Sequence, residues 1–436
     1  MKIEITSSET IQPSAPTPDH LRSYRFSFLD QLSPVLYGPL IFFYPKMDGD
    51  DPSHFLPRLK QALSETLAKF YPLAGRIKDN FSVDCNDEGV LYMEARSDLP
   101  LQEFLKDPRV ESLGRFLPRK TTCEEPLTEA IQATVQVTKF ECGGIAIGTC
   151  FLHKIVDGAS AYYFLNSWAA SARSALGHDA KAMVSPDFTT APSLFPAKDM
   201  LASHMTYVRI DPGIVVVMKR FLLDASAVST IKERARGKNV PNPSRVEAIS
   251  AFIWKHVVLA AHEVNSSGDK TSMFIHSVNF RSRGIPPLPQ GSIGNLYSLA
   301  PAQCDQIEEY EEPSVLVSKI REAIKKVNAD SVKALQTEEG FMKNFKALAS
   351  NPAFKSAKKY WCTSWLRLGF TEVDFGWGKP IWICPSFDTK TSLHKNQIIF
   401  IDEENGGVEV WMVLDQREMD ALERDQEFLA FATPRS

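Results

Sequence analysis

Some segments of this chain show the apolar pattern of strands, and others show apolar residues at the spacing of helices. The sequence therefore predicts a fold built from helices and strands together. A continuous apolar run over residues 145–152 predicts a buried strand, and a second one covers residues 38–44. Apolar residues at steps of three and four predict a helix over residues 55–70, and residues 160–175 show the same period. The second helix follows the first buried strand almost directly.

Shorter patterns extend this alternation along the whole chain. The N-terminal residues 1–6 alternate like a strand, and a long helix with Val246, Ile249, Ile253 and Val257 on one face lies in the second half. A last helix is predicted through Met419, Leu422 and Phe428. Further strands are predicted over residues 82–84, 90–95 and 214–222, with hairpins joining 134–138 to 144–152 and 397–401 to 408–414.

The composition changes after the helix at residues 160–175. Residues 181–207 carry Pro186, Pro192 and Pro196 with few periodic apolar positions, which indicates a segment crossing between domains. A chain of 436 residues is also long for one hydrophobic core. We therefore predict an N-terminal domain over residues 1–180, a crossing segment over 181–213 and a C-terminal domain over 214–436.

Charge and cysteine content narrow the class of protein. The formal net charge of −4 gives no basic field for nucleic acid or an anionic membrane. No apolar stretch is long enough to span a bilayer, and the N-terminus lacks the apolar core of a secretory signal. Seven scattered cysteines without a C-x-x-C pair argue against disulfides or a zinc site. We expect a cytoplasmic protein with reduced cysteines and no metal.

The candidate chemistry lies between the predicted strand and helix in the first half. There His153 precedes Asp157 by four residues, and Gly158 follows. Histidine titrates near neutral pH, so an imidazole held here could take a proton from a hydroxyl or amine. A structurally satisfied histidine at a strand end explains this pattern equally well. The loop from Asp374 to Pro380 holds two glycines in three positions, and taken alone it indicates an ordinary tight turn.

The two motifs together carry a resemblance. Residues 153–158 match H-x-x-x-D-G and residues 374–378 match D-F-G-W-G, in the order and at the separation typical of BAHD acyltransferases. Residues 71–76 (Y-P-L-A-G-R), 278–283 (V-N-F-R-S-R), 286–289 (P-P-L-P) and 294–295 (G-N) also resemble that family. The similarity covers the chain from residue 11 to residue 429. The chain most resembles a branch that mostly uses acetyl-coenzyme A, with alkaloid, terpenoid or volatile alcohols as acceptors.

The resemblance implies an architecture and a reaction. Family members have two similar-sized domains, each a mixed α/β sheet with helices, with a chloramphenicol acetyltransferase-like fold and a channel between the domains. Acyl-coenzyme A serves as co-substrate, and no cofactor is bound permanently. We therefore expect an acyl-CoA-dependent O-acyltransferase, a monomer that acetylates a small-molecule alcohol of plant specialised metabolism.

The same resemblance implies roles for individual residues. His153 would be the general base, and the indole N–H of Trp377 would donate to the oxyanion. Asp157 would support the histidine loop by pairing with an arginine, Arg281 or Arg283, although a catalytic dyad with His153 is the alternative. Asp374 would organise its loop, in which Gly376 and Gly378 permit the backbone shape.

One further site combines a local pattern with the resemblance. Ser244 and Glu247 form a capping box at the start of the long helix, whose N-terminal amides could hold a phosphate. A plain helix start is the commoner reason for this pattern. The family uses the corresponding segment to line its coenzyme A channel, so Ser244 and Arg245 are candidate coenzyme A contacts.

Other readings stay open on sequence alone. His153 and Asp157 could be metal ligands, although no third ligand completes a recognisable pattern. The chain could also be a binding module that keeps the pocket without turnover. Within catalysis, an amine acceptor or a larger acyl donor would fit the same motifs.

Overall fold

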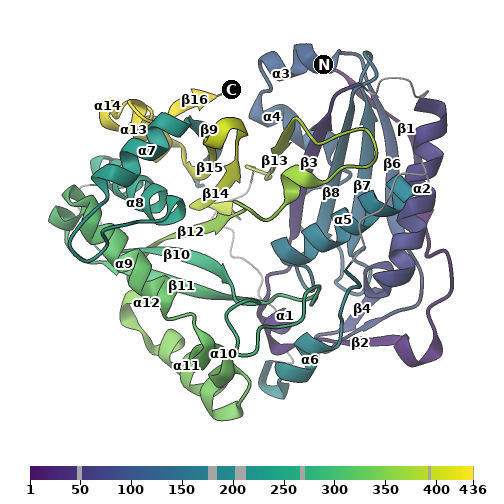
Figure 1. Cartoon of the computed structure of the whole chain (residues 1–436), viewed down its shortest axis with the longest axis horizontal. Coiled ribbons are helices and arrows are strands. Elements are labelled where there is room, and N and C mark those ends of the chain that lie inside the picture. Colours follow the sequence, from purple (N-terminus) through teal and green to yellow (C-terminus); the bar gives the residue numbers. More distant parts are fainter. Residues whose placement is uncertain (47–51, 175–183, 202–212, 266–270, 391–393, 436) are drawn as a thin grey trace. The chain divides into compact units, whose positions relative to one another are not determined.

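The computed structural model describes residues 1–46, 52–174, 184–201, 213–265, 271–390 and 394–435, and Figure 1 shows the chain. The chain forms two compact units. Unit 1 consists of Met1–Val208, Leu288–Leu296 and Arg367–Asp388. Unit 2 consists of Arg209–Pro287, Tyr297–Leu366 and Thr389–Ser436.

Unit 1 is built on a six-stranded mixed sheet with the strand order β1-β6-β7-β8-β3-β13. β6 and β7 run parallel, and the other neighbours pair antiparallel. The strands are β1 (Ile3–Ile11), β3 (Tyr37–Tyr44), β6 (Val90–Ser97), β7 (Ala133–Lys139), β8 (Ile145–Leu152) and β13 (Trp382–Cys384). The predicted strands at residues 38–44 and 145–152 and the 134–152 hairpin are therefore confirmed.

The centre of this sheet is fully buried. All eight residues of β8 are buried, which is why this strand shows as a continuous apolar run. At Gly148 a side chain would meet the carbonyl oxygen of Phe116 at 1.9 Å, so this position in β8 requires glycine. The Phe164 ring of α5 (Gly158–Ser174) packs on Phe151 of β8 at 5.5 Å between centroids, which places α5 against the sheet.

Two long helices of unit 1 pack on each other beside this sheet. α2 (Pro52–Lys69) and α5 are joined where Trp168 Nε1 donates to the carbonyl of Leu59 at 2.9 Å. They correspond to the predicted helices at residues 55–70 and 160–175. The remaining helices of unit 1 are short: α1 (Phe28–Leu32), α3 (Leu101–Lys106), α4 (Val110–Leu113), α6 (Thr190–Leu194) and the 3₁₀ helices η1 (Asp19–Leu21), η2 (Tyr71–Ala74), η3 (Gly114–Phe116), η4 (Asp199–Leu201) and η6 (Phe370–Glu372).

The proline-rich segment is part of unit 1 where the structure describes it, contrary to the prediction of a crossing segment. The Phe28 amide donates to the carbonyl of Phe195, and Asn80 Nδ2 donates to that of Leu201. Phe188 packs on Tyr24 at 5.6 Å between ring centroids. Residues 184–201 therefore pack next to a three-stranded sheet with the order β2 (Ser23–Arg25), β5 (Ser82–Asp84) and β4 (Arg76–Asp79). Residues 181–183 and 202–212 of the predicted segment lie outside the described residues.

The D-F-G-W-G loop also belongs to unit 1, although the sequence placed it in a C-terminal domain over residues 214–436. The reason is β13, which pairs antiparallel with β3 and so becomes the edge strand of the first sheet. Trp382 stacks on Phe43 at 5.1 Å between ring centroids. The chain therefore returns to unit 1 after most of unit 2 has been built.

Unit 2 holds a seven-stranded mixed sheet with the order β11-β10-β12-β14-β15-β9-β16, in which β12 is parallel to both of its neighbours. The strands are β9 (Val216–Leu223), β10 (Ser272–Asn279), β11 (Tyr297–Cys304), β12 (Lys358–Ser364), β14 (Gln397–Asp402), β15 (Val408–Asp415) and β16 (Thr433–Arg435). The predicted hairpin at residues 397–414 is the β14–β15 pair. Two units with a mixed sheet each confirm the predicted fold class.

The helices of unit 2 are organised around α8 (Arg245–Val264), the predicted long helix. Trp254 Nε1 on α8 donates to Ser272 Oγ at the start of β10, and Tyr360 Oη of β12 donates to the carbonyl of Val257. The predicted last helix is two helices, because Asp425 caps a new one. The others are α7 (Ala225–Arg234), α9 (Pro313–Lys325), α10 (Ala329–Leu335), α11 (Glu338–Ser350), α12 (Pro352–Ser356), α13 (Gln416–Leu422), α14 (Gln426–Leu429), η5 (Ile307–Glu311) and η8 (Glu404–Gly406).

Among the helices of the described residues, none is long and apolar enough to cross a membrane.

Candidate active site

His153 lies where the sequence predicted it, in the turn between a buried strand and a helix. β8 ends at Leu152 and α5 begins at Gly158, so His153 is the first residue after the strand. Its backbone amide donates to the carbonyl of Leu36 at 2.9 Å, which continues the β3–β8 pairing by one residue. The residue is half-buried, in contrast to the fully buried residues around it. This backbone is fixed while the residue keeps some access to solvent.

The surroundings of His153 favour its neutral form. Burial lowers the pKa of His153 from its usual value of 6.5, because charging the ring there costs solvation. A hydrogen bond between the ring and the His153 backbone, together with the charge of Asp157, opposes this lowering but does not reverse its direction. A neutral imidazole is the form that can accept a proton, so the site can supply a base at neutral pH.

Asp157 directs its carboxylate at backbone amides. Its Oδ1 accepts from the amide of Ser160 at 2.8 Å and its Oδ2 from the amide of Leu296 at 3.1 Å. The first bond satisfies an amide in the first turn of α5, as a capping carboxylate does. The second bond ties the loop after His153 to a segment 139 positions away. Asp157 thus holds two chain segments together at the back of the candidate site.

Asn295 is a second tie to the same loop, and the sequence assigned it no role. Its Nδ2 lies 2.9 Å from the carbonyl of His153 and 3.0 Å from that of Lys154. The same nitrogen lies 3.0 Å from Oδ1 of Asp30, which also accepts from the Asn295 amide. Ser160 Oγ bonds to the neighbouring Gly294 backbone. The G-N pair within the family resemblance was the available signal for this segment.

Lys154, the residue after His153, points into unit 1. Its Nζ donates to the carbonyls of Gln31 at 3.0 Å and Ser33 at 3.3 Å, and its side chain is buried. Burial lowers the pKa of Lys154 to about 8, while the nearby Asp30 opposes that change. Burial raises the pKa of Asp30, against hydrogen bonds from Ser27 and Asn295. The loop that carries His153 is therefore held by buried polar contacts on both of its sides.

The D-F-G-W-G loop is closed around Asp374. Oδ1 of Asp374 accepts from the amides of Gly376 at 2.7 Å and Gly378 at 2.9 Å. Both glycines have positive φ, 112° and 104°, a region that other residues adopt only with strain. Arg173 of α5 donates to the carbonyl of Asp374. These contacts agree with the expected loop-organising arrangement of Asp374, Gly376 and Gly378.

The position of this loop contradicts the predicted role of Trp377. Its indole packs on Tyr44 at 5.7 Å between ring centroids, at the end of β3. His153 lies beside Leu36, at the start of β3, and the seven residue steps between Tyr37 and Tyr44 span roughly 23 Å.

α5 provides an independent measure of the same separation. Phe375 packs on Trp168 at 4.8 Å between centroids, and Trp168 lies ten residues, roughly 15 Å, along α5 from Gly158. Arg173, which binds Asp374, lies roughly 22 Å along it. An oxyanion donor must reach the carbonyl that the base also serves, within about 3 Å. Trp377 is therefore corrected to a packing residue, whose Nε1 makes no hydrogen bond among the residues described.

The Trp377→Phe variant tests this correction. Phenylalanine keeps an aromatic ring against Phe55, which lies 3.9 Å away between centroids, and removes only the N–H. We expect kcat to stay within about threefold of wild type, because a true oxyanion donor would cost about 100- to 1,000-fold. Steady-state thiol release from acetyl-coenzyme A measures it. A loss of kcat of about 100- to 1,000-fold with an unchanged melting temperature would mean that Trp377 is an oxyanion donor after all.

The two candidate arginines occupy different positions in unit 2. Arg283 Nη1 donates to the carbonyls of Ile324 at 3.1 Å and Val327 at 2.8 Å, which closes the C-terminal end of α9. Arg281 is buried, and its amide donates to Oδ1 of Asn279 at 3.0 Å. Arg283 thus has a structural task of its own. The pairing of Asp157 with either arginine stays a prediction.

The capping box at α8 is confirmed. Ser244 Oγ accepts from the amide of Glu247 at 3.2 Å, and Glu247 Oε2 accepts from the amide of Ser244 at 2.7 Å. Arg321 forms a bidentate ion pair with the same carboxylate: its Nε donates to Oε1 of Glu247 at 2.8 Å and its Nη2 to Oε2 at 2.7 Å. Arg245 Nη2 donates to the carbonyl of Gly407 at 2.9 Å. Ser244 is therefore a helix cap, and its hydroxyl already has a partner.

Comparisons with known proteins support the family and the fold. The chain matches the model of the Transferase family over residues 1–429. It is 40% identical to akuammiline synthase 2 of Alstonia scholaris, over 100% of this chain and 97% of that protein. It is 37% identical to limonoid 7-O-acetyltransferase of Citrus sinensis, over 99% of this chain and 98% of that protein.

A solved structure extends the likeness from sequence to fold. The crystal structure of vinorine synthase matches with a TM-score of 0.82 at 34% identity and covers 99% of this chain and 98% of its own. The family match over residues 1–429, the relatives that align along nearly their whole length and the structural match at 34% identity point to one assignment. The chain belongs to the BAHD acyltransferase family and is an acyltransferase.

Proposed function

We propose that this enzyme transfers the acetyl group of acetyl-coenzyme A to a hydroxyl of a polycyclic alkaloid or terpenoid, with His153 as general base. One observation carries the proposal: His153 is half-buried with a lowered pKa on a backbone that Leu36 and Asn295 hold. A base of this kind needs a fixed position and a neutral ring. The names of two relatives, limonoid 7-O-acetyltransferase of Citrus sinensis and stemmadenine O-acetyltransferase of Catharanthus roseus, support the acetyl group and acceptors of this class.

The reaction follows from these groups without a covalent enzyme intermediate. The neutral imidazole of His153 takes the proton of the acceptor hydroxyl as its oxygen attacks the thioester carbonyl. The C–S bond of the tetrahedral intermediate then breaks, and the imidazolium gives its proton to the departing thiolate. The products are an acetate ester and free coenzyme A, so atoms and charge balance. Asp157 acts in this scheme as support for the loop and not as a member of a dyad.

The test is a matrix of donors and acceptors with the purified full chain. We expect thiol release and ester formation from acetyl-coenzyme A with at least one indole alkaloid or limonoid alcohol, and weaker turnover with hexanoyl-coenzyme A. Product formed only with amines would replace the proposal by N-acylation. Preference for the longer donor would identify a larger-acyl transferase, and coenzyme A binding without any product would favour a binding module.

The pH dependence of kcat/KM gives a second check. Because burial lowers the pKa of His153 below 6.5, the reactive neutral ring is already dominant at neutral pH. Activity should fall as pH decreases through that lowered pKa, with its acid midpoint below 6.5. The measurement is kcat/KM for acetyl-coenzyme A from about pH 5 to 9. An acid midpoint above neutrality would mean that a different group supplies the base.

Three further expectations belong to the same proposal. Ser244 and Arg245 would contact coenzyme A, and Arg245 Nε is buried without a hydrogen-bond partner in the described part of the chain. Arg281 or Arg283 would pair with Asp157. The enzyme would act as a cytoplasmic monomer, which fits its seven free cysteines and is checked by light scattering during gel filtration.

A further inference from the structure

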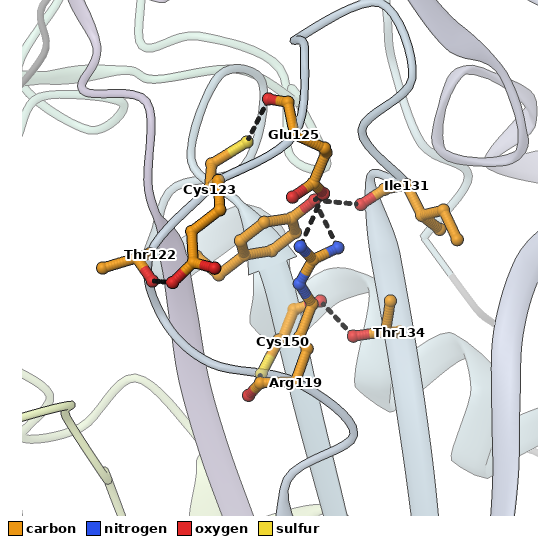
Figure 2. A network of polar contacts seen from close by, with 9 residues as sticks. Arg119, Thr122, Cys123, Glu125, Ile131, Thr134 and Cys150 are labelled. Atoms are coloured by element: carbon orange, nitrogen blue, oxygen red, sulfur yellow. Dashed lines mark hydrogen bonds and ion pairs between the residues drawn. The ribbon is translucent and has the colours of Figure 1, made fainter.

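A polar cluster lies at the start of β3, and we call Tyr37, Arg119 and Glu125 the Tyr37 cluster. Arg119 Nη1 donates to Tyr37 Oη at 2.7 Å, and Arg119 Nη2 donates to Glu125 Oε1 at 2.5 Å. Tyr37 Oη also lies 3.0 Å from Glu125 Oε1 and 2.9 Å from the carbonyl of Ile131. Figure 2 shows the guanidinium of Arg119 and the carboxylate of Glu125 converging at this point, with the Ile131 carbonyl beside them.

The charge state of this cluster is defined. Burial alone would raise the pKa of Glu125, but hydrogen bonds from its own backbone and from Arg119 lower it, so the carboxylate is ionised. Burial raises the pKa of Tyr37 far above its usual value, so its hydroxyl stays neutral and can donate. The Arg119 guanidinium also lies 3.7 Å from the centroid of the Tyr37 ring. Charge-assisted bonds of this kind hold a geometry more firmly than neutral ones.

The Tyr37 cluster is connected to the backbone of His153 through Leu36. Tyr37 is paired with Leu152 in the β3–β8 ladder, and the carbonyl before it, that of Leu36, accepts from the His153 amide. The carbonyl of Gln132, next to Ile131, accepts from the Leu152 amide at 2.8 Å. The amides of Leu152 and His153 therefore bind the carbonyls of Gln132 and Leu36. Gln132 follows Ile131 in the chain and Leu36 precedes Tyr37, so the bond from the Tyr37 hydroxyl to the Ile131 carbonyl joins the same two segments.

We propose that Tyr37, Arg119 and Glu125 are positioning residues for His153, a role that rests on the proposed general-base function. The cluster stabilises the pairing of β3 with β8 at Tyr37 and Leu152, one residue before the base. If the tie is cut, β3 and β8 can separate at this end and the imidazole moves from the acceptor hydroxyl. Small displacements of a catalytic group lower the rate of the chemical step more than they lower substrate affinity.

The Tyr37→Phe variant tests the proposal, because it removes only the hydroxyl. Tyr44→Phe is the matched control: Tyr44 lies on the same strand, is fully buried, and donates to the carbonyl of Val373 at 2.9 Å. Tyr92→Phe is a second control, since the buried Tyr92 hydroxyl on β6 makes no hydrogen bond within the described ranges. All three changes delete one oxygen from the same sheet.

We expect Tyr37→Phe to lower kcat about tenfold with KM for acetyl-coenzyme A unchanged, and both controls to keep kcat within about twofold. Glu125→Gln should lower kcat in the same way, and the double variant with Tyr37→Phe should lose less than the product of the two single losses. Equal kcat for Tyr37→Phe and Tyr44→Phe, or additive losses in the double variant, would overturn the proposal.

A second readout does not depend on turnover. Diethyl pyrocarbonate modifies accessible neutral imidazoles, and peptide mass spectrometry follows His153 alone. In Tyr37→Phe the modification rate of His153 should rise about twofold or more relative to both controls, because the strand ends open more readily. An unchanged rate would overturn the positioning role. A wild-type enzyme without acyl transfer to any acceptor would overturn the proposed function instead, while this rate still decides the role of the cluster.

Discussion

The His153→Ala variant should lose about a thousandfold in kcat for acetyl transfer, within the range that general-base assistance supplies. The fold should survive, because the side chain is half-buried and its backbone amide still binds the Leu36 carbonyl. KM for acetyl-coenzyme A should stay within about twofold, since the base acts on the acceptor. Thiol release and ester formation under saturating donor measure the loss.

The control for this experiment is His20→Ala, which removes an exposed imidazole of unit 1 at η1. It should leave kcat and the melting temperature unchanged. If His153→Ala kept more than about a tenth of the wild-type kcat, a general base at this position would be excluded.

Replacing Asp157 by alanine should lower stability and activity together. The variant leaves two backbone amides, those of Ser160 and Leu296, without their carboxylate acceptor. Losing two charge-assisted bonds inside the protein should cost about 3 kcal/mol of unfolding free energy. The His153 loop then loses its tie to residue 296, so kcat should also fall by about a hundredfold. Urea unfolding and steady-state kinetics give both numbers.

Asp224→Ala provides the comparison, because Asp224 caps α7 through a single bond to the Ala227 amide at 2.7 Å. An ordinary cap of this kind costs about 1 kcal/mol, and kcat should not change. Asp157→Asn separates the two readings of Asp157. If Asp157 orients the imidazole of His153, loss of its carboxylate would lower kcat about 10,000-fold while the protein stays stable. If Asp157 instead only binds the amides of Ser160 and Leu296, asparagine would weaken the bond to one of these amides, and the free energy of unfolding would fall along with kcat.

Long and strongly patterned elements were predictable from the sequence. β8 matches its predicted range because eight consecutive residues are buried, and α8 begins at the predicted capping box. The motif histidine likewise lies at the predicted strand–helix junction. Each of these features is encoded by residues close together in the chain, where periodicity and caps act directly.

The wrong or missing predictions depended on long-range pairing. β13 has only three residues, so no periodicity identifies it, and its pairing with β3 assigned the D-F-G-W-G loop to unit 1. Trp377 was assigned by motif, but its distance from His153 follows from the register along β3 and from the length of α5. Asn295 and the Tyr37–Glu125 contact join residues 142 and 88 positions apart, a separation that no local pattern records.

The late return of residues 367–388 to unit 1 has a consequence for biosynthesis. β8 ends at Leu152, and its sheet receives β13 only about 230 residues later, at Trp382. At ordinary elongation rates this leaves roughly ten to forty-five seconds during which the ribosome-bound chain lacks its edge strand. Throughout that interval the apolar edge at Ile41–Phe43 is unpaired, although all three residues are fully buried in the finished protein. The nascent enzyme therefore presents a defined stretch of β3 for chaperones to shield, and premature stop codons between residues 153 and 381 should yield insoluble fragments.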